Sequence, residues 1–256
     1  MGNGKKLLLD RNDSVAMKEK VIKPESDSVR KMFSSIAPKY DRANRILSLG
    51  IDIYWRKVLV DWVAQQNPTI VIDLATGSGD VAFALQNRLA ENTRVEGFDF
   101  CPKMLEQAIT KNKKHPMAEP IRFSLGDCLD LPIENQSVDV LTIAFGFRNL
   151  ENRPKGLKEM LRVLRPNGSL FILEFTQPES WFRPFYAIYL KYLLPKIAVL
   201  STGNQSAYHY LSGTIEQFPH KQKIKKELEN AGFKSVVYKT LTAGTVAIHF
   251  GKKPPV

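Results

Sequence analysis

One short segment constrains the fold of this chain more than any other. The apolar run 70–72 leads into Asp73, and the small-residue segment 75–79 follows before a helix-like run over residues 81–85. This order predicts a buried strand, a turn and a helix. Gly77 and Gly79 allow backbone dihedrals that other residues avoid, and they let a ligand approach closely. The segment therefore predicts an α/β fold with a ligand at the end of its first strand.

A second acidic residue makes a nucleoside the expected ligand. Asp99 ends the next apolar segment, twenty residues after Gly79, and a carboxylate there can accept both hydroxyls of a ribose. Asp73 and the missing third glycine separate the loop from the dinucleotide pattern, which disfavours a dehydrogenase. The loop resembles motif I of the class I methyltransferases, which bind S-adenosylmethionine. An ordinary glycine turn is the alternative.

Composition is that of a globular protein in a reducing compartment. The chain has 256 residues, 43% of them hydrophobic and 25% charged, enough for one large α/β domain with a sizeable core. Cys101 and Cys128 show neither metal spacing nor a disulfide framework. We expect no signal peptide and no metal site, and a cytoplasmic location.

The net charge of +11 is unevenly distributed along the chain. Residues 1–40 carry +4 and residues 41–150 carry −2, whereas residues 151–256 carry +9, from 16 basic and seven acidic side chains. A basic surface can bind nucleic acid or an anionic membrane, or serve solubility alone. No basic stripe is interleaved with aromatic residues, so we expect no nucleic-acid partner.

Strand and helix patterns alternate from residue 70 onward. Residues 1–27 are polar and predict a flexible N-terminal arm, and residues 28–66 predict helices that open a single domain over 28–256. Expected helices run to residue 89 and over 102–111, 154–164 and 221–231, with a turn at 165–168. The expected strands cover residues 70–74, 94–99, 121–125, 138–144, 169–174, 233–240 and 245–250.

An aromatic insertion over about residues 178–218 interrupts this alternation. The segment is too short and too charged to span a bilayer. It can be a helix packed on the sheet, or a lid over an apolar substrate pocket that also touches a membrane surface. The density of aromatic residues just after a strand end favours the lid.

Polar residues follow the third and fourth strands, where ligands of open α/β sheets bind. Asp127 precedes Cys128, and its carboxylate can accept the amino group of an adenine; a turn or helix cap is the alternative. Arg148 and Asn149 follow the fourth strand. Arg148 stays protonated, so it can stabilise an oxyanion or orient a water but cannot act as a base. A salt bridge to Glu151 or Asp127 is the alternative for Arg148.

Several longer stretches resemble the ubiquinone/menaquinone biosynthesis C-methyltransferases, the UbiE/MenG family. One is Ile143-Ala144-Phe145-Gly146-Phe147-Arg148-Asn149, and the similarity extends over about residues 28–250. The other matching stretches are residues 33–44, 47–55, 162–166, 173–176, 208–211 and 215–219. Asp52 stands where the family pattern has His. The chain also departs from the pattern at Ala43, Ser78, Ala144, Asn167 and Thr176.

The resemblance implies a class I S-adenosylmethionine-dependent methyltransferase with a Rossmann-like, mostly parallel seven-stranded sheet and helices on both faces. It implies methylation of a ring carbon in a prenylated quinol, demethylmenaquinol or the equivalent ubiquinone precursor, in respiratory quinone biosynthesis. The sequence does not choose between a naphthoquinol and a benzoquinol. Another small lipid-like acceptor, or less favourably an RNA, stays open, as does peripheral contact with a membrane.

The resemblance also implies the site residues. Arg148 and Asn149 would hold the quinol oxygen with Tyr40 nearby as donor or relay, and Asp41 and His209 are candidate bases. Residues 181–211 would cover the prenyl tail. The expected cofactor-binding residues are Asp73, Thr76, Gly77, Ser78, Gly79, Asp99, Asp127, Cys128 and Ala144.

Overall fold

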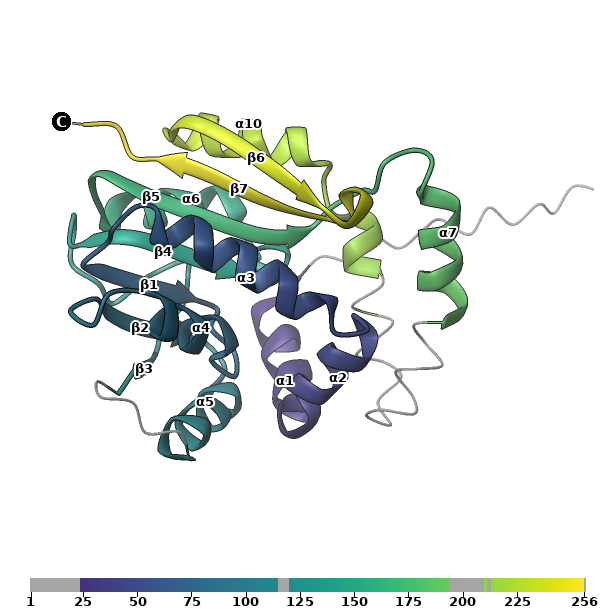
Figure 1. Ribbon diagram of the computed structural model, residues 1–256, viewed down its shortest axis with the longest axis horizontal. Coiled ribbons are helices and arrows are strands. Elements are labelled where there is room, and N and C mark those ends of the chain that lie inside the picture. The colour runs from purple at the N-terminus through teal and green to yellow at the C-terminus, as the bar shows by residue number, and fades with distance from the viewer. Residues whose placement is uncertain (1–23, 115–119, 194–209, 211–212, 256) are drawn as a thin grey trace, which may run out of the picture.

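A seven-stranded sheet forms the centre of the computed structural model, which describes residues 24–114, 120–193, 210 and 213–255 (Figure 1). The strand order is β3-β2-β1-β4-β5-β7-β6. β7 runs antiparallel to both its neighbours, and the other pairs are parallel. This confirms the expected mostly parallel sheet. The strands are β1 (Ile70–Leu74), β2 (Arg94–Asp99), β3 (Arg122–Leu125), β4 (Val138–Ala144), β5 (Leu164–Phe175), β6 (Lys234–Leu241) and β7 (Val246–Lys252).

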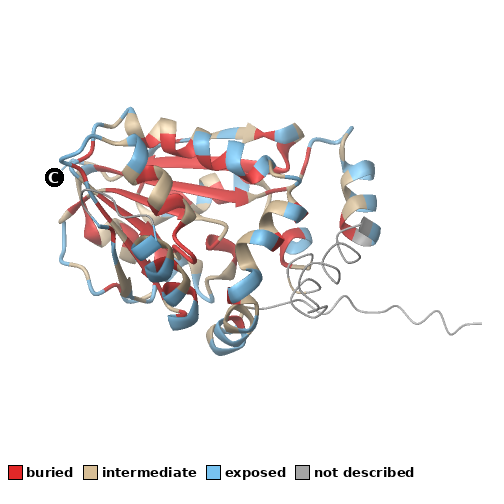
Figure 2. Cartoon of the chain, turned by 60° about the horizontal axis from the view of Figure 1, so that its bottom comes forward, coloured by how far each residue is buried: buried red, intermediate tan, exposed pale blue. Residues whose placement is uncertain are grey.

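Helices cover both faces of the sheet because the strand side chains alternate between two cores. Val71 and Val140 pack with α3 (Ile51–Ala64) and α4 (Asp80–Arg88). The next residues along the strands, Ile72 and Leu141, pack with α6 (Arg153–Val163) and α10 (Lys221–Ala231). Figure 2 shows the central strands as buried and the outer helix surfaces as exposed.

The predicted turn at residues 165–168 is instead part of β5, which begins directly after α6. The backbone N–H of Asn167 donates to the carbonyl of Lys253, and the N–H of Lys253 donates to the carbonyl of Gly168. The chain beyond β7 therefore continues the sheet alongside these residues. The local geometry still bends, since Asn167 has a φ of 66° and the β4–β5 register shifts between Val138 and Val140.

Of the remaining helices, the one that follows β2 packs beside β2 and β3, and most of the others lie beyond the ends of the parallel strands (Figure 1). These remaining helices are α1 (Ser26–Ile36), η1 (Ala37–Lys39), α2 (Tyr40–Leu47), α5 (Pro102–Lys114), η2 (Phe147–Asn149), α7 (Arg183–Ile188), η3 (Tyr189–Leu193) and η4 (Thr242–Gly244). α2 packs on η3 through Ala43 and Leu47, which contact Leu190 and Tyr189. Within the part of the chain that the structure describes, no helix combines the length and apolar character needed to cross a membrane. Residues 1–23 of the predicted arm lie outside the described residues.

Candidate active site

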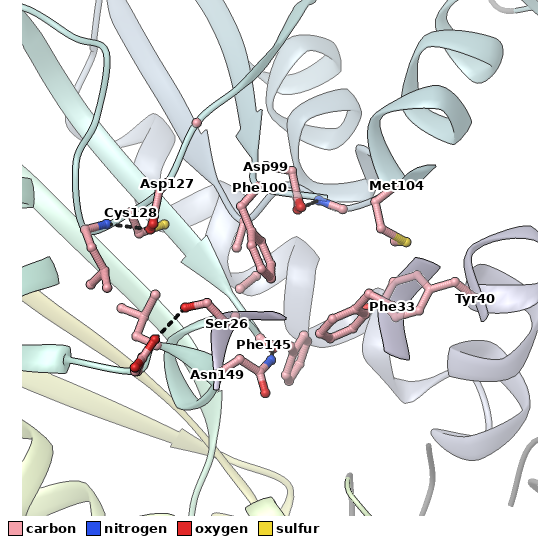
Figure 3. Close-up of a pocket in the computed structure, with 18 residues that line it drawn as sticks. Ser26, Phe33, Tyr40, Asp99, Phe100, Met104, Asp127, Cys128, Phe145 and Asn149 are labelled. Carbon is pink, nitrogen blue, oxygen red and sulfur yellow. Dashed lines mark hydrogen bonds between the residues drawn. The ribbon is translucent and has the colours of Figure 1, made fainter. Parts of the chain in front are cut away.

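The first cavity lies at the point where the strand order reverses. β1 pairs with β2 on one side and with β4 on the other, and ligands of open α/β sheets bind at such a switch point. The loops after β1, β2, β3 and β4, together with α1, line a cavity that is open to solvent and has about 690 Å³ of empty space (Figure 3). Its lining includes Tyr40, Gly77, Asp99, Asp127, Cys128, Ala144 and Asn149 from the predicted site.

The backbone is strained at both strand ends that flank this switch point. Ala75, after β1, and Phe145, after β4, have φ values of 48° and 57°. The two loops approach so closely that a Cβ on Gly146 would lie 2.5 Å from the Cβ of Ala75. Strain of this kind persists where the surrounding structure enforces it, and it concentrates at functional sites.

Hydrogen bonds fix the glycine loop against β2. The N–H of Thr76 donates to the Phe98 carbonyl at 3.0 Å, and the N–H of Gly77 donates to Oδ2 of Asp99 at 2.8 Å. A Cβ on Gly79 would lie 2.8 Å from the Phe83 ring, so this position accepts little beyond glycine. The loop therefore has one defined shape, and Asp99 is part of what holds it.

Asp99 and Asp127, two of the three carboxylates that line the first cavity, differ in their surroundings. Asp99 is 5% exposed and also accepts the N–H of Cys101 at 2.8 Å. Burial raises the pKa of Asp99 to about 6. Asp127 is exposed, and its Oδ1 accepts the N–H of Leu129 at 2.9 Å, which is a turn contact. Its other oxygen can still face a ligand, because both carboxylates line the cavity.

Apolar side chains form the other walls of the first cavity, and the sequence reasoning did not assign them. Phe33 comes from α1, Phe100 follows β2, and Met104 comes from α5 (Figure 3). Leu129 closes the cavity on the β3 side. The sequence could have indicated Phe100, because it directly follows Asp99. Met104 is predicted from the sequence only as a core residue of its helix.

Four predicted cofactor residues lie outside the lining of this cavity and shape the loop. Asp73 is buried and accepts the hydroxyls of Thr76 at 2.6 Å and Thr142 at 2.7 Å. Burial raises the pKa of Asp73 to about 6. Ser78 donates to Asp41 on α2, and Gly79 is the N-cap residue of α4, with a φ of 86°.

A second, larger cavity of about 1450 Å³ adjoins the first. It lies among α1, α2, α3, α7 and η3, and its walls are mainly aromatic and aliphatic. Phe33, Tyr40 and Phe145 line both cavities. The two spaces therefore share one aromatic wall, so ligands in them would meet there.

Arg148 faces the second cavity from η2 and is held by Glu174. Its Nη1 donates to Glu174 Oε1 at 2.7 Å and to the Phe145 carbonyl at 2.6 Å. Its ion-pair partner is thus neither Glu151 nor Asp127. Among the described residues, the buried Nε of Arg148 has no hydrogen-bond partner, and a buried unpaired donor calls for an explanation.

The other predicted catalytic residues do not lie together: two of them line a cavity, one lines neither cavity, and one is outside the described residues. Asn149 lines the first cavity, and its Oδ1 accepts the hydroxyl of Tyr210 at 3.3 Å. Burial raises the pKa of Tyr40, although Arg148 is among the charges that lower it, so the phenol is a proton donor at neutral pH. Asp41 lines neither cavity and pairs with the Nζ of Lys111 at 2.5 Å. His209 lies outside the described residues.

Metal ligands do not gather in the part of the chain that the structure describes. No three His, Cys, Asp or Glu side chains there are placed to hold an ion. Cys128 is buried beside the first cavity, and burial raises the pKa of its thiol.

Solved structures share this fold at low sequence identity. A SAM-dependent methyltransferase of Thermotoga maritima, described as a possible histamine N-methyltransferase, matches with a TM-score of 0.60 at 15% identity, covering 87% of this chain and 98% of that chain. The cyclase SpnF matches with a TM-score of 0.66 at 14% identity, covering 92% and 98%. These similarities show that the chain has the class I methyltransferase fold, as expected.

Sequence comparisons are more specific. The demethylmenaquinone methyltransferase of Thermus thermophilus is 44% identical over 87% of this chain and 100% of its own length. That of Deinococcus radiodurans is 40% identical over 90% and 94%. The ubiquinone/menaquinone biosynthesis C-methyltransferase UbiE of Citrifermentans bemidjiense is 38% identical over 90% and 97%. The model of the ubiE/COQ5 methyltransferase family matches residues 19–253, and the chain belongs to this family.

Proposed function

We propose that the protein transfers the methyl group of S-adenosylmethionine to a ring carbon of a prenylated quinol, converting demethylmenaquinol to menaquinol. One observation carries the proposal: a cavity at the switch point of the sheet, with a buried carboxylate in its lining, shares an aromatic wall with a larger apolar cavity. The names of the relatives, demethylmenaquinone methyltransferase and UbiE, support ring methylation in quinone biosynthesis.

The first cavity fits the cofactor. Asp99 would accept the ribose hydroxyls and Asp127 the adenine amino group, between the apolar walls of Phe100 and Met104. A Cβ on Gly126 would lie 2.8 Å from the ring of Phe98, so the loop after β3 can pack this closely on β2 because the position is glycine. When bound, the cofactor supplies an electrophilic methyl group on a sulfonium.

The second cavity fits the acceptor ring and its tail. A phenolic hydroxyl must lose its proton to a base before the neighbouring carbon becomes nucleophilic, and that carbon gives up its own proton once it carries the methyl group; Asp41 and His209 stay the candidate bases. Arg148 would hold the resulting oxyanion, using a guanidinium that is already fixed by Glu174. Tyr40 would donate or relay a proton from the shared wall. Holding the two reactants in line across that wall supplies a large part of the rate gain.

The acceptor cavity has an apolar rim, which supports peripheral contact with a membrane. Among the described residues, nine of the twelve exposed large hydrophobic side chains lie on two segments, the α2–α3 corner and the α7–η3 region. Leu49, Ile51 and Phe185 are exposed and also line the cavity. Trp181 and Tyr192 add aromatic side chains of the kind found at membrane interfaces. We place the protein at a cytoplasmic membrane surface, where a prenyl tail can enter from the lipid.

Another small lipid-like acceptor is the second candidate, because the apolar lining would suit other greasy rings. Nothing in the comparisons favours it, or an RNA or a dehydrogenase reaction. A purified enzyme assay with S-adenosylmethionine, reduced demethylmenaquinone and its benzoquinol counterpart distinguishes the acceptors. Mass spectrometry of quinones in cells that lack and regain the gene checks the reaction in place. If the strain that lacks the gene accumulates no demethylated quinone, the proposal is wrong.

Sedimentation with liposomes tests the membrane contact separately. Vesicles of mixed neutral and anionic lipid should carry the protein down, and replacing Leu49 and Trp181 with Ser should release it. Equal sedimentation of the wild type and this variant would show that the rim is not the contact surface.

A further inference from the structure

We propose that Arg56 forms a second oxygen-binding site in the acceptor cavity, so that the cavity selects rings with hydroxyl groups at both ends. The inference rests on the proposed function and adds what determines its specificity. Arg56 lies on α3 and Arg148 on η2, and both line the second cavity.

Two buried cations in one mainly apolar cavity require an explanation. The side chains of Arg56 and Arg148 are 9% and 6% exposed. Each is paired, Arg148 with Glu174 and Arg56 with Asp52, yet a well-packed apolar pair is often more stable than a buried ion pair. Arg148 has its assigned role at the oxyanion, whereas Arg56 has none.

The two guanidinium groups flank one aromatic pair. The guanidinium carbon of Arg56 lies 5.9 Å from the centre of the Phe145 ring, and that of Arg148 lies 5.3 Å from the centre of the Phe175 ring. The two rings are adjacent, with centroids 4.9 Å apart. Each guanidinium thus lies beside a different ring of the pair, so an acceptor ring held against these aromatics has two separate cations within the same cavity.

Asp52 positions Arg56 for this task. It is 3% exposed and accepts Nη1 of Arg56, and it also accepts the hydroxyl of Ser48 at 2.7 Å. Asp80 adds a weaker ion pair with Arg56 at 3.7 Å. A guanidinium carries five N–H donors, so Arg56 can hold Asp52 and still donate to a ligand. Asp52 is thus a positioning residue, at a place where this sequence departs from the family pattern.

The two oxygens of a 1,4-quinol give the two cations different tasks. One oxygen loses its proton and activates the neighbouring carbon, which is the task assigned to Arg148. The oxygen at the far end of the ring takes no part in the bond change. A donor at that oxygen would instead fix how the ring lies against the shared wall, which decides which carbon faces the methyl group.

Acceptor analogues with one or two ring hydroxyls test the inference. Arg56→Met removes the charge at similar length, and Arg56→Lys keeps the charge. For a short-tailed 1,4-naphthalenediol, we expect kcat/KM of Arg56→Met to fall by about 10- to 100-fold, the usual effect of losing a hydrogen bond to a charged group. For the 1-naphthol with the same tail the decrease should be less than about threefold. Arg56→Lys should recover part of the activity, mainly through KM.

Arg45 supplies a matched control. It pairs with the same carboxylates, Asp52 and Asp80, but lines neither cavity. Arg45→Met should leave the ratio of kcat/KM for the two acceptors unchanged. Asp52→Asn should raise KM for the diol. This variant should bind S-adenosylhomocysteine with the same affinity as the wild type. Titration with S-adenosylhomocysteine shows whether each variant is folded. If Arg56→Met does not bind it, the ratio of kcat/KM for the diol and the naphthol is measured in Arg56→Lys instead.

The outcomes separate this inference from the proposed function. Equal losses on both acceptors, or the same change of ratio in Arg45→Met, would overturn the second oxygen site while leaving quinol methylation intact. A wild-type protein that methylates neither demethylmenaquinol nor the diol would overturn both.

Discussion

Asp99 is the residue on which the cofactor assignment depends most. Asp99→Ala should weaken the binding of S-adenosylmethionine by about 1–3 kcal/mol, because polar groups of the ligand and the N–H of Gly77 lose their partner. Isothermal titration calorimetry measures the change. Asp139→Ala is a matched control, since Asp139 accepts the N–H of Ile70 at 2.9 Å at the other end of the strands. This control should lose stability but keep its cofactor affinity.

The pKa of Asp99 gives the same assignment a pH signature. Burial raises this pKa to about 6 in the free protein, whereas hydrogen bonds from ribose hydroxyls favour the ionised carboxylate. Cofactor affinity should therefore decrease as the pH falls below about 6, and Asp99→Asn should show a smaller decrease. Identical pH profiles for the wild type and Asp99→Asn would place the ribose elsewhere.

Arg148 carries the prediction about chemistry. Arg148→Ala should lose about 2–4 kcal/mol of transition-state stabilisation, as other oxyanion donors do, and Arg148→Lys should keep some activity. Both variants should still bind cofactor. Arg148→Ala also leaves the buried Glu174 unpaired, so the double variant with Glu174→Gln separates lost stability from lost catalysis. Near-normal kcat with a lower Tm would make this arginine structural.

At the scale of elements, α7 tests whether the aromatic insertion covers a tail. Phe185 is 64% exposed and lines the acceptor cavity, whereas Trp181 is 68% exposed and does not line it. Phe185→Ala should raise KM for long-tailed quinols well above its effect on short-tailed ones, and Trp181→Ala should change both alike in a detergent-free assay of soluble analogues. Adenosylmethionine affinity should stay constant in both variants. A loss confined to Tm would make Phe185 a packing residue.

The close approach of the β1 and β4 ends makes a second prediction at this scale. Gly146→Ala would force two Cβ atoms to 2.5 Å, so the strand ends must separate. We expect a loss of about 1–3 kcal/mol in stability, typical of overpacking, together with weaker cofactor binding. Gly50→Ala is the control, because Gly50 has a φ of 77° but nothing within 4 Å of an added Cβ. That variant should lose stability without losing affinity.

For the whole molecule, the alternation of patterns predicted every strand of the sheet and the end of α10 at Gly232, which has a φ of 110°. Those features depend on local periodicity and on glycine, which a sequence displays directly. The acceptor cavity was predicted only as a lid over a pocket. Its walls combine α1–α3 with α7 and η3, and such packing of distant segments leaves no local pattern. The pairing of Arg148 with Glu174, 26 residues apart, was missed for the same reason.

Global stability should depend on pH through His249. Burial lowers its pKa to about 4, and its Nε2 lies 2.8 Å from the Lys221 carbonyl. Because the pKa in the folded state is depressed, this contribution to stability is complete above about pH 6.5 and is lost as the pH falls towards 4. The loss can reach about 3 kcal/mol, at 1.36 kcal/mol per pKa unit.

His249→Gln isolates this effect, because glutamine can donate to the carbonyl but does not titrate. Urea unfolding at pH 7, 5.5 and 4 measures the free energy of unfolding of both proteins. The difference between the wild type and the variant should become smaller as the pH falls. Asp73 and Asp99 act in the other direction, since their raised pKa values favour the folded state as the pH falls. Both carboxyls are present in the wild type and in His249→Gln, so their contributions cancel in the difference between the two free energies of unfolding. A constant difference would mean that His249 titrates normally.

The aromatic wall shared by the two cavities also has a consequence for inhibitor design. Phe33, Tyr40 and Phe145 belong to both spaces, so one compound can span them: an adenosine group joined by a short linker to an alkyl or prenyl tail. Once one end is bound, the other end binds intramolecularly, and the combined affinity can exceed that of either part by about 10²–10⁴-fold. The tail would give such a bisubstrate ligand its selectivity, because the larger, apolar cavity is the space that we propose for the acceptor.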